Sequence, residues 1–285
     1  MIHRPALGLA ELERLFDEDA LYGDLTTHAL GIGGRAARMT LRARGDMCVC
    51  GTEDAERLLR HLGLDATRDC DSGRTVRAGT VLMRCEGDAA SLFAAWKVVQ
   101  TLLEWLSGIA TETRAIVDAA RGGATDVAVA CTRKNLPSTR RLAAYAVIAG
   151  GGAMHRLGLA ETVLIFPEHR RFLDDGDTLA DAILRCRRVA PERGIVVEVT
   201  DEADAVAAIE AGADVLQLEK FTPVAVARVR TVVDGGSGRR PRVAAAGGIH
   251  AGNAADYAAA GAEILVTSRP YAAAPRDVAV ELRPA

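Results

Sequence analysis

Three cations stand close to apolar runs in the middle of this chain. Arg133 and Lys134 follow the run DVAVAC, and Arg156 follows His155 just after a glycine run. Guanidinium and ammonium groups recognise phosphate and carboxylate oxygens through charge-assisted hydrogen bonds. The formal net charge of the chain is −3, so no general basic field attracts anions. The pattern therefore predicts a local anion site.

Two carboxylates belong to consecutive apolar runs. Glu198 lies in IVVEVT and Glu219 in DVLQLE, with Gln217 inside the second run. The carboxylates could act as general acid and base. They could instead hold Mg²⁺ and the hydroxyls of a sugar phosphate, because hard cations take oxygen ligands and often bridge phosphates. A third interpretation is a structural ion pair with Lys220 or an arginine. The nearby cations favour the magnesium and sugar-phosphate interpretation.

Small and hydroxyl-bearing residues end two later apolar runs. Gly247 and Gly248 follow RVAAA and lead into a predicted helix, so their backbone N–H groups could face a phosphate. Thr267 and Ser268 end the run EILVTS. His155 is a weaker candidate, because a lone histidine is more often a hydrogen-bonded structural residue than a catalyst.

The elements that must position these residues alternate regularly in the C-terminal part of the chain. Nearly continuous apolar runs are typical of strands covered on both faces, and repeated strand–helix units predict a parallel sheet, either doubly wound or closed as a barrel. Polar residues at the end of each run favour the barrel, whose carboxyl strand ends meet at one mouth. The expected strands span 126–131, 162–166, 195–200, 214–219, 242–248 and 263–268.

The N-terminal part of the chain mixes helix and strand signals. Met39 and Leu41 alternate with polar residues, which predicts a half-buried strand. Thr52 and Gly63 carry the cap signals of a helix between them. Residues 88–108 have an apolar stripe at helical spacing, which we interpret as core.

The composition excludes several classes of protein. With 49% hydrophobic and 26% charged residues, the chain is typical of soluble globular proteins. It lacks the basic field of nucleic-acid binders. No apolar stretch approaches the roughly 18 residues that span a bilayer, and the N-terminus lacks a leader core, so we expect a cytoplasmic protein without a membrane partner. The six cysteines show no zinc-ligand spacing, and we expect them to be packing residues.

Several short motifs occur in a characteristic order. They are GDLTT at 23–27, LSGIAT at 106–111, TRK at 132–134, HRLGL at 155–159 and AGADVLQLE at 211–219. From about Gly23 to Ser268 the chain resembles the quinolinate phosphoribosyltransferase family. The resemblance implies an enzyme, a pentosyltransferase, that joins a nitrogen base to phosphoribosyl pyrophosphate (PRPP) with Mg²⁺ and releases pyrophosphate.

The resemblance also implies a fold and an assembly. The fold is α/β, with an N-terminal α/β sandwich domain and an open, TIM-like α/β barrel. We assign 1–110 to the sandwich and 111–269 to the barrel, and expect the tail 270–285 to return to the sandwich. The assembly is a homodimer, or a higher even oligomer, in which one subunit's N-terminal domain covers the barrel mouth of the other.

The matching motifs assign expected roles. Lys134, Glu198 and Glu219 are the catalytic candidates, and Glu198 and Glu219 are also the candidate metal ligands that face the ribose. Gly247 and Gly248 face the 5′-phosphate. The full set of expected substrate-binding residues is Lys97, Arg133, Lys134, His155, Arg156, Phe166, Ala246, Gly247, Gly248, Thr267 and Ser268.

The chain departs from the family pattern at several of these positions. Phe166 stands where the family has a lysine for the substrate carboxylates, Lys97 replaces an arginine, Glu219 an aspartate and Ala246 a serine. Removing a cation from a pocket that binds a dianion typically weakens the binding free energy by several kcal/mol, because charge is left unpaired. Phe166 instead offers an aromatic face to a flat or less charged ring. These departures resemble the ModD branch of the family, the pyrophosphorylases of molybdenum-transport operons, and predict a ring-nitrogen acceptor other than quinolinate.

Two other functions fit part of the pattern. Lys134 at a barrel strand end could form a Schiff base, as in aldolase-like enzymes. The protein could also be a non-catalytic sensor of a phosphorylated metabolite linked to molybdenum metabolism. Neither function requires the paired carboxylates and the glycine turn together, so we rank both below phosphoribosyl transfer.

Overall fold

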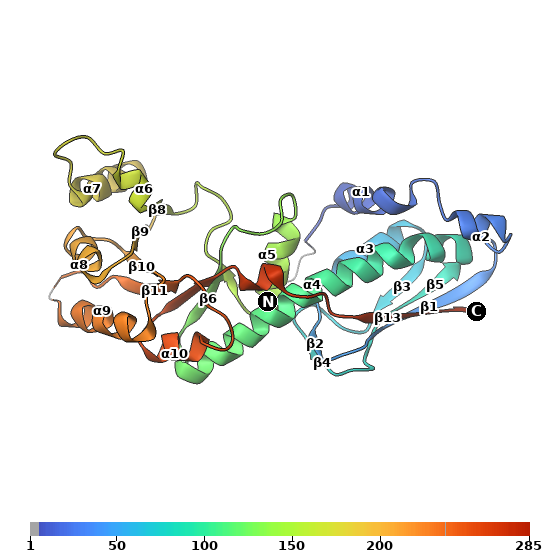
Figure 1. Cartoon of the computed structure of the whole chain (residues 1–285). Coiled ribbons are helices and arrows are strands. Elements are labelled where there is room, and N and C mark those ends of the chain that lie inside the picture. The colour runs from blue at the N-terminus through green and yellow to red at the C-terminus, as the bar shows by residue number, and fades with distance from the viewer. Residues whose placement is uncertain (1–5, 237) are drawn as a thin grey trace. The chain divides into compact units, whose positions relative to one another are not determined.

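The chain folds into two compact units (Figure 1). The computed structural model describes residues 6–236 and 238–285, so residues 1–5, which carry part of the leader prediction, lie outside the described residues. Helix α4 (Ala89–Gly123) contributes residues to both units. The first unit comprises Met1–Arg114, Leu136–Gly151 and Pro270–Ala285, and the second comprises Ala115–Asn135 and Gly152–Arg269.

A four-stranded antiparallel sheet forms the first unit. Its strand order is β13 (Val278–Pro284), β1 (Ala36–Ala43), β5 (Val81–Asp88) and β3 (Asp65–Arg68). Met39 and Leu41 are buried while their neighbours face outward, as their alternation predicts. The unit also contains α1 (Leu9–Ala20), α2 (Leu25–Ala29), α3 (Thr52–His61), α5 (Arg140–Ala149) and a ladder of β2 (Met47–Cys48) with β4 (Thr75–Val76).

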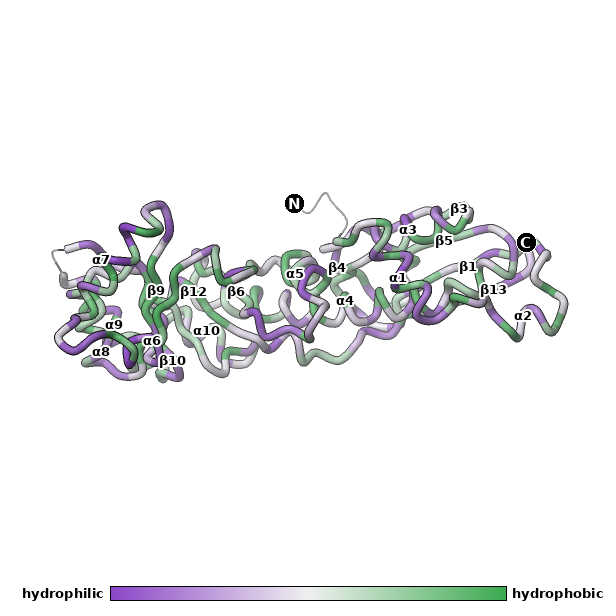
Figure 2. Tube along the Cα trace, turned by 90° about the horizontal axis from the view of Figure 1, so that it is seen from above, coloured by the Kyte–Doolittle hydropathy of each residue, from purple (hydrophilic) through white to green (hydrophobic). Residues whose placement is uncertain are grey.

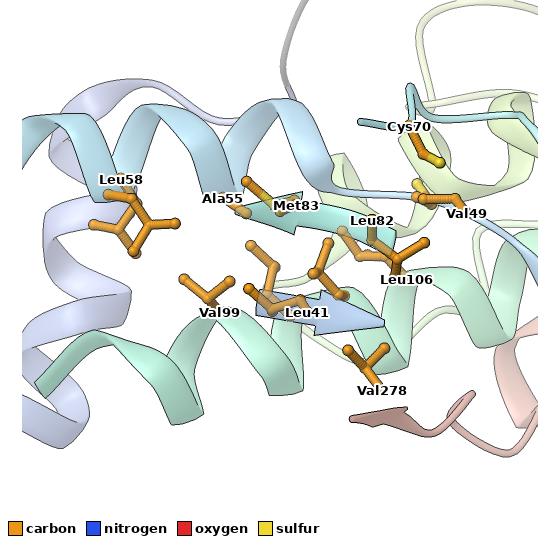
Figure 3. Close-up of a cluster of buried hydrophobic side chains, with 14 of the residues drawn as sticks. Leu41, Val49, Ala55, Leu58, Cys70, Leu82, Met83, Val99, Leu106 and Val278 are labelled. Carbon is orange, nitrogen blue, oxygen red and sulfur yellow. The ribbon is translucent and has the colours of Figure 1, made fainter. Parts of the chain in front are cut away.

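Helix α4 supplies much of the core of this unit. Figure 3 shows Val99 and Leu106 of α4 in one cluster with Leu41 of β1 and Leu82 of β5. Burying each such side chain stabilises the fold by roughly 1.5–3 kcal/mol. The stripe along residues 88–108 is therefore core, as predicted. All six cysteines are free thiols, and five of them are buried packing residues.

A seven-stranded parallel sheet forms the second unit. Its order is β7 (Ala153–Met154), β6 (Ala128–Cys131), β12 (Ile264–Thr267), β11 (Arg242–Ala246), β10 (Val215–Glu219), β9 (Ile195–Val199) and β8 (Val163–Ile165). Every pair is parallel. The strands β7 and β8 are consecutive in the chain yet lie at opposite edges, so the curled sheet is open. This confirms the predicted open α/β barrel.

Helices connect the strands and cover one face of the sheet. They are α6 (Pro167–Arg170), α7 (Leu179–Val189), α8 (Glu202–Glu210), α9 (Pro223–Gly235) and α10 (Ala254–Ala259), with a 3₁₀ turn η1 at Arg269–Ala272. Hydrophobic residues are concentrated along strands such as β9 and β12 (Figure 2). None of the helices in the described ranges combines the length and the apolar character that a membrane crossing needs.

The two faces of this sheet differ in chemistry. Val197, Leu216, Leu218 and Leu265 pack with helix residues in one buried cluster, which defines the outer face. Side chains alternate along a strand, so the residues between these positions point to the other, inner face. The inner face carries a small apolar cluster that includes Ala244. It also carries the polar residues described next.

Candidate active site

Glu198 and Gln217 lie side by side on the inner face. Their Cα positions are paired between β9 and β10, and Gln217 Nε2 donates a hydrogen bond of 2.6 Å to Glu198 Oε2. Gln217 is buried, and its Oε1 atom has no hydrogen-bond partner in the described part of the chain. A buried amide oxygen without a partner is costly, so a ligand hydroxyl or a cation bound at this atom would offset that cost.

Glu219 lies one inner-face position further toward the carboxyl end of β10. It pairs with Ala246 on β11, and its Oε1 lies 3.0 Å from the position a Cβ would take on Gly247. The carboxylate thus stands against the turn that follows β11. Glu198 and Glu219 are brought to one edge of the sheet, as the parallel-strand argument predicts.

The pKa of the Glu198 carboxyl depends on burial and on the charged and polar groups around it. Burial raises the pKa of the Glu198 carboxyl above its usual range, and the negative charges of Glu219 and Glu168 raise it further. The hydrogen bond from Gln217 and the positive charge of Lys134 act in the opposite direction. The carboxylates of Glu219 and Glu168 and the ammonium of Lys134 therefore lie within electrostatic reach of Glu198.

Arg156 is a buried cation. Only 8% of its surface is exposed, and burial followed by the charge of Arg133 lowers the pKa of its guanidinium. Within residues 6–236 and 238–285 no carboxylate forms an ion pair with Arg156, Arg133 or Lys134. A buried charge without a partner is strongly unfavourable. The pair Arg133 and Arg156 is therefore suited to an external anion.

His155 and Lys134 differ in exposure. His155 follows β7, its backbone N–H donates to Cys131 O at 2.9 Å, and burial followed by Arg156 lowers the pKa of its imidazole. The ring is therefore neutral near pH 7. Lys134 is exposed, and its backbone N–H donates to Thr132 Oγ1 at 3.2 Å. Its ammonium group is free to reach a ligand.

The glycine turn after β11 lies beside Glu219. Gly247 and Gly248 have φ values of 88° and 83°, which favour glycine. Neither backbone N–H donates a hydrogen bond within the described ranges. The Thr267 hydroxyl is buried, donates to Ile249 O at 2.7 Å and accepts from Arg269 N–H at 3.0 Å. Thr267 thus supports this turn, and its one hydroxyl proton is already used inside the chain.

The remaining expected residues lie in different surroundings. Ala246 is buried at the end of β11, where its methyl group cannot donate a hydrogen bond. Ser268 directly follows β12 and is half-buried. Lys97 belongs to the first unit, where Nζ donates to Gln100 Oε1 at 2.9 Å and lies 4.2 Å from the ring centroid of Trp96.

Phe166 continues β8 in extended geometry, with φ −89° and ψ 160°. Its ring stacks on that of His169, with centroids 5.6 Å apart and planes inclined by 24°. The backbone N–H of Phe166 donates to His169 Nδ1 at 3.0 Å. An aromatic pair therefore stands where the family resemblance implies a lysine.

The glycine run before His155 has a packing role at its first member. A Cβ on Gly150 would lie 2.5 Å from Ala110 O and 2.6 Å from Thr113 Cβ. Only glycine allows this close approach of α5 and α4. This part of the run is therefore explained without an anion.

The donor set fits Mg²⁺ held together with phosphate groups. Glu198 and Glu219 provide carboxylate oxygens on adjacent strands, and Gln217 Oε1 is buried without a partner. In the described ranges no group of three or more His, Cys, Asp or Glu side chains forms a cage. Protein Mg²⁺ sites commonly use one or two carboxylates plus substrate phosphates.

A cleft of about 750 Å³ adjoins the carboxyl ends of β8 and β9, where Pro167 and Thr200 contribute to its lining. Arg170, Arg171, Asp201 and Asp204 are among its lining residues, and none of the expected site residues lines it. Arg170 already pairs with Asp204 at 2.7 Å. We therefore assign the site to the inner-face strand ends, where Lys134 lies within electrostatic reach of Glu198 and Arg133 within reach of Arg156.

Two residues near the site were not among the expected site residues. Gln217 lies inside an apolar run, and Glu168 lies just past the run that ends at Phe166. A buried polar residue within a strand that carries Glu219 two positions later is the signal that could have indicated Gln217, because both positions face the same side.

Known protein families match the two parts of this chain. The N-terminal domain model of quinolinate phosphoribosyl transferase matches residues 24–107, and the C-terminal domain model matches residues 109–281. The chain belongs to the quinolinate phosphoribosyltransferase family. As a member of this family it is a phosphoribosyltransferase, a pentosyl-transferring enzyme, which confirms the resemblance drawn from its motifs.

Individual relatives agree with this family. The chain is 50% identical over 244 residues to the pyrophosphorylase ModD of Rhodobacter capsulatus, covering 86% of this chain and 93% of that protein. It is 39% identical over 279 residues to the ModD of Escherichia coli O6:H1, covering 98% of each. Among solved structures, NadC from Streptococcus pyogenes has a TM-score of 0.87 at 24% identity and covers 97% of this chain and 96% of its own. At this identity, the match to NadC shows that the two proteins share a fold and nothing further.

Proposed function

We propose that this phosphoribosyltransferase takes PRPP and Mg²⁺ and transfers the phosphoribosyl group to a ring nitrogen of an acceptor other than quinolinate. The observation that carries the proposal is the buried Arg156, which has a second guanidinium beside it and no carboxylate partner in the described ranges. Such a charge needs an anion from outside the chain. PRPP supplies one.

The cations bind the donor in this proposal. Arg133 and Arg156 present planar guanidinium groups, which suit the paired oxygens of phosphate and pyrophosphate. Lys134 adds a mobile point charge at the same strand end. As the bond from the anomeric carbon to pyrophosphate breaks, its electron pair leaves with the pyrophosphate, and these cations stabilise the growing negative charge.

The carboxylates act on the ribose. Glu198 and Glu219, with the free Oε1 of Gln217, accept hydrogen bonds from the ribose hydroxyls and stabilise positive charge on the sugar ring. The acceptor nitrogen then forms its bond to the anomeric carbon from the opposite face. When bound, Mg²⁺ supplies Lewis-acid neutralisation of the phosphate oxygens.

The acceptor assignment rests on Phe166. A dicarboxylate needs cations in its pocket, and the position expected to provide one carries an aromatic ring instead. The ModD relatives are named pyrophosphorylases, whereas other relatives are named carboxylating nicotinate-nucleotide pyrophosphorylases. We also propose a homodimer with shared active sites, supported by the family resemblance, and a cytoplasmic location, as expected from the composition.

Calorimetry tests the donor half of the proposal. The protein should bind PRPP in the presence of Mg²⁺, and Arg156→Ala should weaken that binding. Pyrophosphate release from PRPP, measured across a panel of ring-nitrogen acids, purines and pterins, tests the transfer. Efficient turnover of quinolinate would contradict the acceptor assignment, and absence of PRPP binding would contradict the function. Binding without turnover of any acceptor would favour a sensor.

A further inference from the structure

Phe166 and Glu198 point to the same face of the sheet. Ile165 pairs with Val197, and both belong to the buried cluster on the outer face. The next residues along the two strands are Phe166 and Glu198. Phe166 keeps an extended backbone, so its side chain follows the alternation and points to the inner face. The aromatic ring therefore stands beside the carboxylate assigned to the ribose.

The hydrogen bond within the aromatic pair defines the tautomer of His169. Because the Phe166 N–H donates to His169 Nδ1, a neutral imidazole must carry its proton on Nε2. His169 is exposed, so this Nε2–H group can donate to a ligand. The pair combines a flat surface with one directed donor.

A carboxylate and two paired arginines lie on the elements beside this aromatic pair. The Glu168 carboxylate lies close enough to Glu198 to raise the pKa of its carboxyl. Arg170 pairs with Asp204, and Arg185 pairs with Asp177 at 2.7 Å. Arg171 forms no ion pair within the described ranges and lines the cleft beside α8. A dianionic ring beside Phe166 would face the carboxylates of Glu168 and Glu198, while Lys134, which also acts on Glu198, is assigned to the donor phosphates.

A small, mostly apolar pocket adjoins His169. It has a volume of about 250 Å³ and runs along the open edge of β8, where Leu164, Leu173 and Cys186 contribute to its lining. Ligand pockets are typically apolar with few polar groups that orient the ligand. The two arginines in its lining, Arg170 and Arg185, already pair with Asp204 and Asp177, so the edge of a flat ring that extends past His169 would meet a mostly apolar surface.

We propose that the surface formed by Phe166 and His169 binds the acceptor as a flat, uncharged heteroaromatic ring, which stacks on the ring of Phe166 and accepts, edge to edge, a hydrogen bond from His169 Nε2. This inference rests on the proposed function and narrows its acceptor to neutral rings. Phe166 is then a specificity-determining residue, since it replaces attraction for carboxylates with stacking.

Equilibrium binding of four probes tests the proposal. Pyridine-2,3-dicarboxylate, pyridine-3-carboxylate and pyridine-3-carboxamide share one ring and differ in charge, and hypoxanthine adds a larger neutral ring. Calorimetry is done with Mg²⁺ and pyrophosphate present, which excludes turnover. The carboxamide and hypoxanthine should bind the wild-type protein at least roughly tenfold more tightly than the dicarboxylate, because they leave no unpaired charge.

Three variants separate the contributions. Phe166→Lys should shift the ratio of dicarboxylate to carboxamide affinity by roughly tenfold or more toward the dicarboxylate. Phe166→Ala should weaken binding of the neutral rings by about tenfold through lost stacking. His169→Phe keeps a ring and removes the donor, so it should weaken hypoxanthine binding severalfold. The matched control is Phe172→Lys, the same change at a side chain that is 89% exposed, and it should leave the affinity ratio unchanged.

The outcomes distinguish this inference from the proposed function. If PRPP binds but the dicarboxylate is preferred and Phe166→Lys leaves the ratio unchanged, the neutral-acceptor inference is wrong while the transferase proposal stands. Failure of all four probes to bind the donor-competent protein also overturns it. If PRPP does not bind, the proposed function fails and the acceptor assignment fails with it.

Discussion

Gln217 Nε2 donates a hydrogen bond of 2.6 Å to Glu198 Oε2 across neighbouring parallel strands, and its own Oε1 is buried without a partner in the described ranges. One amide thus stabilises the ionised carboxylate and offers a free acceptor beside it. This arrangement makes the protonation of Glu198 sensitive to its two neighbours on β10.

Changing Gln217 and Glu219 should move the acid limb of the pH–rate profile in opposite directions. Gln217→Met removes a hydrogen bond that lowers the pKa of Glu198, so the limb should move to higher pH. Glu219→Gln removes a like charge that raises this pKa, so the limb should move to lower pH. Pyrophosphate release measured from about pH 4 to 9 checks both. Shifts in the same direction would contradict the assigned interactions.

Glu198→Gln should cost activity and increase stability at neutral pH. The folded-state pKa of Glu198 is raised, so the native protein holds this proton more tightly than the unfolded chain. Its contribution to stability is present below the ordinary glutamate pKa and is lost as the pH rises through the folded value. The thermal midpoint of the variant should therefore exceed that of the wild type near pH 7 and match it below about pH 4.

The same variant should lower kcat by roughly 100-fold, as expected for loss of a charge that stabilises the transition state. Glu192→Gln, at an exposed position in the same unit, is the matched control and should change neither quantity. An equal gain in stability at every pH would contradict the ionisation argument.

Arg156→Ala should reduce PRPP affinity without unfolding the protein. Loss of charge-assisted hydrogen bonds should weaken binding by about 10- to 100-fold. The wild-type charge is buried without a carboxylate partner in the described ranges, so its removal should leave the thermal midpoint unchanged or higher. Arg156→Lys should recover little affinity, because an ammonium lacks the bidentate geometry.

Calorimetry and thermal melts together check this expectation. Arg188→Ala changes an exposed arginine of α7 and should leave PRPP binding intact. A large loss of stability in Arg156→Ala, with unchanged binding per folded molecule, would identify Arg156 as a structural residue instead.

Gly247→Ala should be more damaging than Gly248→Ala. Both positions have positive φ, so each alanine should cost about 1–2 kcal/mol of stability. At Gly247 the new Cβ would also lie 2.7 Å from Lys220 Cγ and 3.0 Å from Glu219 Oε1, whereas at Gly248 nothing lies within 4 Å. Chemical denaturation should show the larger loss for Gly247→Ala. Equal losses would mean that the turn relaxes without moving Glu219.

Lys134→Arg should retain much of the activity that Lys134→Ala loses. If Lys134 contributes charge to the binding of PRPP, a guanidinium can replace it in part, and alanine should lower kcat/KM by roughly 10- to 100-fold. A Schiff-base enzyme would lose all activity in both variants, since arginine cannot form the imine. Borohydride should also trap no substrate on the wild-type lysine.

The chemistry at the strand ends could be predicted because parallel strands place their carboxyl ends at one edge. Arg133, Glu198 and Glu219 are all found at that edge, and the open barrel and the family follow from the same alternation and motifs. For Thr267 the same reasoning predicts the position along the strand but not the direction of the side chain. Its position at a strand end is as predicted, but its hydroxyl is turned inward to Ile249 and Arg269.

The amino-acid sequence by itself indicated six of the seven strands of the parallel sheet and the residues at their ends that could do chemistry, because these depend on local periodicity and composition. Only the tertiary structure decided that β10 lies between β9 and β11, so that Gln217 faces Glu198 and Glu219 faces Gly247. It also buried Arg156 and stacked Phe166 on His169. Strand order, register and burial arise from packing between segments far apart in the chain, which no local pattern encodes.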